Sequence, residues 1–500
     1  MDTLKAERIT YNSANLLKPR ASAAIEYSTT PYRFGVVIFY LLTIVCTSVN
    51  TTAFSAAFNE IASAYKVPVI EVTMTSIVFN ITYIPMTFAA IYCFREYSKE
   101  LNFRITCGVL LTGAWLRSCA GSDFGIVLLG QTIISLTYPF LLSSVTLVCY
   151  SWLDAKERLL WVQLLALALP LGTMLSFLEA GIMYSGAPSA STDNAAFLNF
   201  YFKQTKAFIL VQNIQLTVSV VGFIAFFRER PTNPPSPEAN VKPQKIELRE
   251  SFGQCFANKG FVIVCVNFAC MYGAFAAMSD VLSLVFTSFN SLRVSDGIKP
   301  YETAEVSAYG ALTTVAGVSC SFTSAILLKK YGKFLVPMRV FITLTGLMML
   351  LALIFVPKGG FVGVGIILVL LGMSLVPLIP LSYAYASKLT YPMDPPTTQG
   401  ILLMSGMGFG AIEGTIGTFI CQVDPRILIA LWILQAMIAL ANTFRMPEEE
   451  EIKDEKIQLS VWGDIQILPI EGAADLNDTG FFDGKEQSYM SLAIDEAQTQ

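Results

Sequence analysis

The sequence predicts an all-α polytopic membrane protein, and two observations carry this prediction. The 500 residues are 54% hydrophobic and only 14% charged, with a mean hydropathy of +0.57, whereas soluble domains carry about 25% charged residues. Many apolar stretches reach about 20 residues, the length that a helix needs to cross a bilayer. These observations exclude a soluble globular enzyme, a disordered chain and a collagen-like fibre.

Twelve apolar stretches predict twelve transmembrane helices. The first six cover 34–57, 71–94, 102–120, 124–150, 159–185 and 206–227. The second six cover 260–288, 303–328, 334–356, 361–384, 397–421 and 427–444. A polar linker at 228–259 separates the two sets, and its prolines at 231, 234, 235 and 237 cannot continue a helix.

Six spans, a linker and six further spans form the plan of the major facilitator fold, which has two similar halves. The sequence therefore divides into five parts. These are an N-terminal segment at 1–33, a first six-helix half at 34–227, the linker at 228–259, a second six-helix half at 260–444 and a tail at 445–500.

The distribution of Lys and Arg predicts the orientation. If the N-terminus is cytosolic, the cytosolic segments before the tail hold 20 Lys and Arg residues, and the opposite loops hold seven. Short cytosolic loops are enriched in these residues. We therefore expect both termini to be cytosolic in a multi-pass protein of the plasma membrane or an endolysosomal membrane.

The two ends of the chain carry separate expectations. The segment 1–33 lacks the apolar core of a cleavable signal peptide, so the first span is expected to direct insertion. The tail holds 14 acidic residues against three lysines and is expected to be mostly disordered. It is either a solvated tail or a sorting segment, because 489–492 (Tyr-Met-Ser-Leu) fits a tyrosine-based pattern that sorting adaptors bind.

Composition also excludes several kinds of site. The net charge of −4 offers no basic field for nucleic acid. The chain has no histidine, and its ten cysteines form no C-x-x-C pair, so neither a metal site nor a disulfide framework is expected. We find no nucleophile–base pair and no phosphate-binding loop. The protein is therefore expected to be no enzyme and to use no cofactor.

Three acidic residues lie inside predicted spans, where a charge is costly unless it faces a cavity or a partner. Glu413 lies near the middle of the eleventh span in a glycine-rich segment. We expect it to face the cavity and to provide charge recognition or proton coupling; the alternative is a protonated packing residue. Glu179 and Asp280 lie in the outer halves of the fifth and seventh spans and are candidate coupling or rim charges.

Other polar and aromatic residues complete the predicted pocket. Asn50, Gln131 and Asn267 lie on spans that normally line the cavity, although amides between helices also serve in packing. Phe54 and Tyr272 provide rings that can stack on a cation. Arg117 ends the third span and is expected to reach the outer headgroups. In the loop between the second and third spans, Arg95, Glu96 and Arg104 are candidates for a cytosolic gate.

Seven short segments in the same order resemble one family. They are 83–85 (Tyr-Ile-Pro), 113–117 (Gly-Ala-Trp-Leu-Arg), 130–131 (Gly-Gln), 151–158 (Ser-Trp-Leu-Asp-Ala-Lys-Glu-Arg), 231–236 (Pro-Thr-Asn-Pro-Pro-Ser), 273–275 (Gly-Ala-Phe) and 389–392 (Leu-Thr-Tyr-Pro). Together they resemble the feline leukaemia virus subgroup C receptor-related family of major facilitators. The resemblance covers about 34–444.

The resemblance implies alternating access and a choline- or ethanolamine-like cation, or a haem-related solute. Carried over residue by residue, the family's first-span tryptophan falls near Phe54. Its seventh-span tyrosine falls on Ala276, and its fifth- and eleventh-span glutamines fall on Pro170 and Met407. Because these changes remove one face of an aromatic cage, we expect that choline is not the best substrate.

The sequence thus predicts a facilitator-type transporter that carries a small organic solute by alternating access. We expect it to act as a monomer in the lipid bilayer. The alternative is a non-transporting receptor or sensor that keeps the fold and uses its acidic tail to bind partners.

Overall fold

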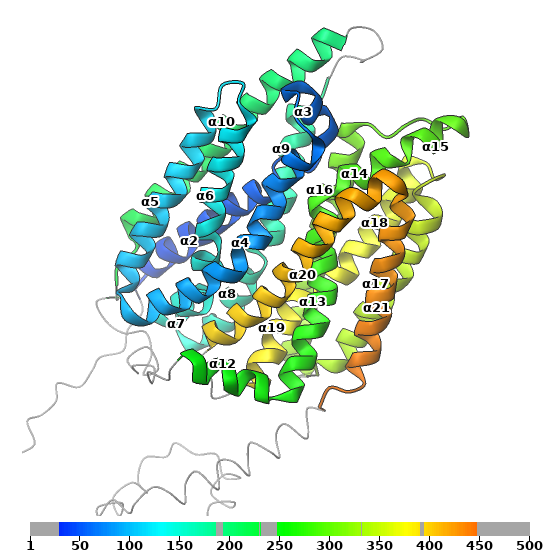
Figure 1. Ribbon diagram of the computed structural model, residues 1–500. Helices are drawn as coiled ribbons and strands as arrows, with labels where there is room; N and C mark the ends of the chain where they lie inside the picture. The colour runs from blue at the N-terminus through cyan, green and yellow to red at the C-terminus, as the bar shows by residue number, and fades with distance from the viewer. Residues whose placement is uncertain are drawn as a thin grey trace, which may run out of the picture. The chain divides into compact units, whose positions relative to one another are not determined.

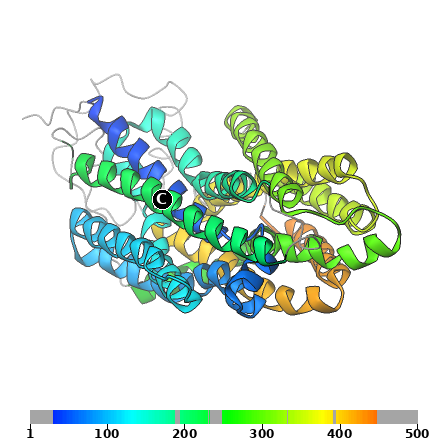
Figure 2. The ribbon, with the colours of Figure 1, turned by 90° about the horizontal axis from the view of Figure 1, so that it is seen from above.

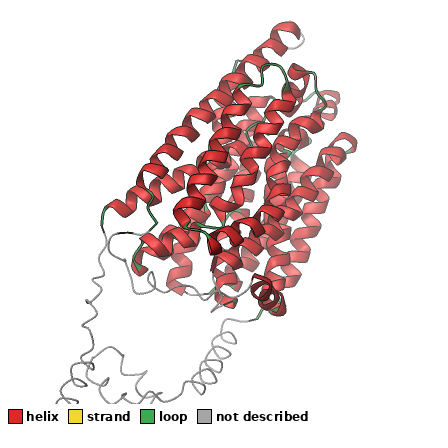
Figure 3. Ribbon diagram, turned by 60° about the vertical axis from the view of Figure 1, so that its left-hand side comes forward, coloured by secondary structure: helices red, strands yellow, loops and turns green. Residues whose placement is uncertain are grey.

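The computed structural model describes residues 30–186, 194–229, 231, 248–331, 333–390 and 395–447. Every regular element among these residues is a helix, which confirms the all-α prediction (Figures 1 and 3). The sorting pattern at 489–492 and nearly all of the tail lie outside the described residues.

The helices divide at the linker into two sequential groups. The first group is α2 (Tyr32–Thr51), α3 (Phe58–Tyr65), α4 (Val69–Glu96), α5 (Lys99–Ser118), α6 (Phe124–Leu142), α7 (Val145–Trp152), α8 (Ala155–Ala166), α9 (Ala168–Met183) and α10 (Asn194–Phe226). After α12 (Leu248–Ala257), the second group is α13 (Lys259–Asp280), α14 (Leu282–Ser288), α15 (Asn290–Ser295), α16 (Thr303–Tyr331), α17 (Leu335–Phe355), α18 (Phe361–Leu375), α19 (Leu378–Leu389), α20 (Pro395–Val423) and α21 (Pro425–Thr443).

Local sequence explains where several helices begin. The side chains of Ser98, Asp123, Asn258 and Asp424 each accept a hydrogen bond from a backbone N–H in the first turn of α5, α6, α13 and α21. These residue types are strong N-caps because they satisfy backbone donors that the helix leaves unpaired.

Nine of the described helices are long and apolar enough to cross a membrane, and the bent pair Leu160–Ala166 and Ala168–Met183 makes up to ten. The helices α5 and α16, which match the predicted third and eighth spans, are not among these ten. The protein is therefore a multi-pass membrane protein, while the count of twelve spans stays a prediction.

Figures 1 and 2 show the first half, blue to cyan, beside the second half, green to orange. Across the boundary, α4 packs along α20 and α9 packs along α16. We call the end of the helices that carries α12 the linker end, and the end that carries α3 and α15 the distal end (Figure 1).

Contacts between the halves occur at both ends. At the distal end, the Ser283 N–H donates to the Ser55 carbonyl at 3.2 Å, and Asn59 Nδ2 donates to Thr287 Oγ1 at 2.9 Å. At the linker end, Arg95 Nη2 donates to Thr397 Oγ1 at 3.3 Å. Hydrogen bonds therefore join the two halves at both ends.

Within the second half, α16 and α18 cross in close contact. A Cβ atom on Gly372 of α18 would lie 1.9 Å from the Thr313 carbonyl oxygen of α16. Only glycine permits this backbone approach.

Candidate functional site

A cavity with polar and aromatic walls lies between the two halves. Both halves contribute to its wall, through α4, α6 and α9 on one side and α13 and α20 on the other. The lining residues are Thr51, Thr52, Ser76, Asn80, Tyr138, Leu169, Thr173, Tyr272, Phe275, Ala276, Ser279, Asp280 and Met407.

Asp280 is the acidic residue in this wall. It ends α13, is only 4% exposed, and its Oδ2 accepts a hydrogen bond from Asn80 Nδ2 of the other half at 2.7 Å. Gly414 of α20 lies beside the carboxylate, and a Cβ atom there would be in ordinary contact with Oδ2 at 3.7 Å. The structure thus places Asp280 where a solute held between the halves would meet it.

Two tyrosines give the cavity an aromatic surface. Tyr272 stacks on Phe268 with ring centroids 4.8 Å apart, and its hydroxyl donates to Met407 Sδ at 3.6 Å. Tyr138 shares a hydrogen bond of 3.1 Å with Ser48. Tyr272 therefore lies in the wall as expected from the sequence, and Tyr138 lies there with it.

The expectation that Glu413 faces the central cavity is wrong. Glu413 is 8% exposed, and its two carboxylate oxygens accept hydrogen bonds from Trp432 Nε1 and Gln435 Nε2 of α21, both at 2.9 Å. Both donors belong to its own half, so they hold the carboxylate toward α21 and away from the other half.

Glu179 follows the same pattern in the first half. Its Oε1 accepts a hydrogen bond of 2.6 Å from Gln215 Nε2 of α10. The fifth and eleventh predicted spans therefore each carry a glutamate that binds a glutamine of the next span. Neither glutamate lines the polar cavity.

Arg117 does not extend to the headgroups as expected. It is 1% exposed, with Nη1 donating to Gln131 Oε1 at 2.8 Å and Nη2 donating to Asn213 Oδ1 at 2.7 Å. Gln131 in turn donates to the carbonyl oxygen of Asn50. Arg117 therefore joins α5, α6 and α10 and supports the end of α2.

This network also explains the positions of Asn50, Gln131 and Phe54. The Asn50 side chain donates to the Cys46 carbonyl at 2.7 Å, and Phe54 packs near Phe124 with ring centroids 6.3 Å apart. None of the three lines the polar cavity; Thr51 and Thr52, which follow Asn50 directly, do.

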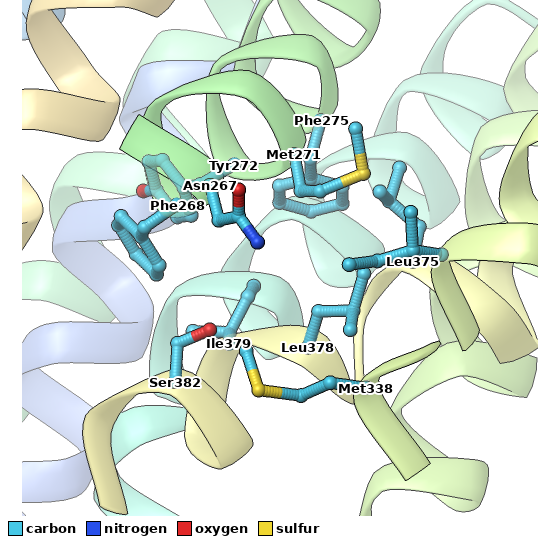
Figure 4. A pocket seen from close by; sticks show the side chains of 11 residues that line it. Asn267, Phe268, Met271, Tyr272, Phe275, Met338, Leu375, Leu378, Ile379 and Ser382 are labelled. Carbon is cyan, nitrogen blue, oxygen red and sulfur yellow. The ribbon is translucent and has the colours of Figure 1, made fainter. Parts of the chain in front are cut away.

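Asn267 belongs to a separate, mainly apolar cavity inside the second half (Figure 4). Its Nδ2 donates to the Ala439 carbonyl at 3.1 Å. Around it lie Phe268 and Met271 of the same helix, Met338 of α17 and Ser382 of α19. Asn267 therefore supports helix packing and does not reach the polar cavity.

The predicted gate residues separate in the structure. Arg95 reaches the other half through Thr397, as described above, whereas Arg104 pairs with Glu100 on its own helix. Glu96 is the last residue of α4. Arg95 therefore bridges the halves, and Arg104 stays within the first half.

Helical spacing groups several of the lining residues, including the predicted Tyr272 and Asp280. Ser76 and Asn80 are four apart on α4, and Tyr272, Ala276 and Asp280 are four apart on α13. Residues at this spacing share one helix face. Both sets line the cavity, and so does Met407. Ala276 and Met407 are two of the positions onto which the resemblance carries pocket residues of the family.

The chain is similar in sequence to known membrane transporters. A sequence model described as the Major Facilitator Superfamily matches residues 40–418. The choline/ethanolamine transporter FLVCR1 of Felis catus is 22% identical over 477 residues, covering 91% of this chain and 79% of its own. The choline/ethanolamine transporter flvcr2a of Danio rerio is 23% identical over 428 residues, covering 83% and 87%.

Solved structures agree on the fold. A bacterial homologue of the human lysosomal transporter Spinster aligns with a TM-score of 0.59 and 13% identity, covering 84% of this chain and 98% of its own. The transporter FucP, in the outward conformation, aligns with a TM-score of 0.55 and 13% identity, covering 81% and 98%. The family resemblance and the major facilitator fold expected from the sequence are thereby confirmed.

Proposed function

Because this chain belongs to the Major Facilitator Superfamily, and its relatives named above are choline/ethanolamine transporters by name, we propose that it carries a small organic cation across its membrane by alternating access. The two halves rock around a site between them in this mechanism. The polar cavity lies in that position, with walls from both halves.

The observation that carries the proposal is Asp280 in the cavity wall. A carboxylate at membrane depth is costly unless a partner compensates it. The cavity lining contains no Lys or Arg, and the chain has no His. A cationic solute can provide the missing positive charge, and Tyr138 and Tyr272 can face it with aromatic rings.

The cavity favours an amine that carries N–H groups. The carboxylate of Asp280 and the hydroxyls of Ser76, Thr173 and Ser279 can accept hydrogen bonds, but the methyl groups of a quaternary ammonium cannot donate them. The relatives transport choline and ethanolamine by name. Of these two classes, the primary amine fits the wall better.

We therefore predict that ethanolamine competes for uptake about tenfold better than choline, because one net hydrogen bond is worth roughly 1 kcal/mol or slightly more. The measurement is inhibition of labelled ethanolamine uptake in proteoliposomes that contain the purified protein. Dimethylethanolamine, with a single N–H donor, should fall between the two. Choline as the strongest competitor would contradict the predicted preference, and no competition by any amine would contradict the proposed solute class.

We also propose that both termini face the cytosol, since the segments that would then be cytosolic hold 20 Lys and Arg residues before the tail, against seven in the opposite loops. Tags at either end should then resist protease in intact cells and become accessible after permeabilisation. A tag inserted after Gly186, at the distal end, is the matched control and should be cleaved without permeabilisation. Cleavage of a terminal tag in intact cells would reverse the proposed orientation.

A further inference from the structure

Among the residues that the structure describes, no Lys or Arg lies in the cavity wall around Asp280. From α4, Asn80 approaches it; from α6, Tyr138; and from its own helix, Tyr272. The packed helix α20 presents Gly414, while Glu413 of that helix points toward α21. Among the described residues, its only side-chain hydrogen bond comes from the neutral amide of Asn80.

Glu179 on the cavity-lining helix α9 of the first half also faces elsewhere. Glu179 of α9 is directed to Gln215 of α10. Thr51 and Thr52 from the end of α2, and Thr173 from α9, contribute hydroxyl groups only. Phenols, hydroxyls and amides cannot neutralise a carboxylate. Its charge must therefore be compensated by a mobile cation whenever the halves enclose it.

Two mobile cations can reach the same oxygen atoms: the ammonium of the solute and a proton. Asn80 occupies Oδ2, and no described residue donates to Oδ1. The Asn80 bridge between the halves can persist whichever cation is bound, because a neutral carboxyl keeps an acceptor oxygen. The ammonium and the proton therefore compete for one site.

We propose that Asp280 binds the solute ammonium and a proton alternately, so that the protein exchanges one organic cation for one proton. This inference rests on the proposed function and adds its coupling. When the ammonium leaves, the carboxylate takes one proton from the water on that side. When the site opens on the other side, an arriving ammonium displaces that proton into the water there. One positive charge crosses in each direction, so no net charge is moved.

The test uses the purified full chain in weakly buffered detergent solution with a pH-indicator dye. Adding ethanolamine or choline to the wild-type protein should release close to one proton for each molecule bound. Asp280→Asn keeps the side-chain shape and an acceptor for Asn80. It should release none and should bind ethanolamine at least tenfold more weakly.

Glu413→Gln is the matched control, because it also removes a buried acidic group of the second half. Gln435 can turn its amide, whose Oε1 has no partner, to accept from the new side chain. This variant should therefore fold, bind ethanolamine as the wild type does and release the same number of protons.

Each outcome decides separately on the exchange and on the proposed function. Amine binding without proton release at any pH from acidic to neutral, or unchanged release by Asp280→Asn, would overturn the exchange while leaving the transporter of organic cations intact. If neither amine binds, the proposed solute class is wrong.

Infrared spectroscopy then tests the proton site alone. A protonated Asp280 gives a carboxyl C=O stretching band that Asp280→Asn lacks. Absence of this band at acidic pH would overturn the proton site.

Discussion

Arg117→Met should lower the stability of the protein by about 2–5 kcal/mol, because it leaves the oxygens of Gln131 and Asn213 buried without their donor. Each orphaned buried group costs about 1–3 kcal/mol. Gln131 also holds the Asn50 carbonyl, so the end of α2 beside Thr51 and Thr52 should loosen as well. The melting temperature of the purified protein, followed by size-exclusion fluorescence, should fall by at least about 5 °C.

Arg104→Ala is the control for the loss of an arginine from the same helix. The Arg104 side chain is 54% exposed and pairs only with Glu100 one turn away. Such surface pairs contribute about 0–1 kcal/mol, so the melting temperature should change little. Equal effects of the two substitutions would show that the buried network does not stabilise the first half.

Gly372→Ala should be the second severe substitution. The added Cβ would overlap the Thr313 carbonyl of α16. Because this neighbour is backbone and not a flexible side chain, α16 and α18 would have to separate. Overpacking costs about 1–3 kcal/mol or more, and the upper end applies here. We expect a lower melting temperature and reduced yield of monodisperse protein.

Gly363→Ala provides the matched control on the same helix. No atom outside its own helix segment lies within 4 Å of a Cβ at this position. Alanine is favoured over glycine in a helix by up to about 1 kcal/mol, so this variant should be as stable as the wild type or slightly more stable. Destabilisation by both substitutions to the same extent would refute the close crossing as the cause.

The all-α fold and its division into halves could be predicted because both follow from two properties of the sequence, the length of its apolar stretches and the position of its proline-rich linker. Apolar length sets the spans, and the prolines of the linker set the boundary between them. The span count was less certain because α5 and α16 carry charged or small polar residues, such as Arg117 and the serines of α16. The resemblance of collinear segments led to the family because it used order along the whole chain.

The candidate site was only partly predictable, because depth in a span does not indicate which way a side chain points. Glu413 is the deepest acid in the sequence, yet Trp432 and Gln435 turn it away from the cavity. Asp280 is closer to a helix end but faces the other half. Tertiary partners decide between the two, and they become visible only once α20 and α21 are placed side by side.

The paired glutamates have a mechanical consequence. Glu179 ties α9 to α10, and Glu413 ties α20 to α21, so in each half an outer helix is fixed to an inner one by a bond that lies away from the solute path. Such ties stiffen each half against shear. During the transport cycle, relative motion should therefore concentrate at the two contacts between the halves, α4 with α20 and α9 with α16. Each half should rotate as a rigid body about these contacts.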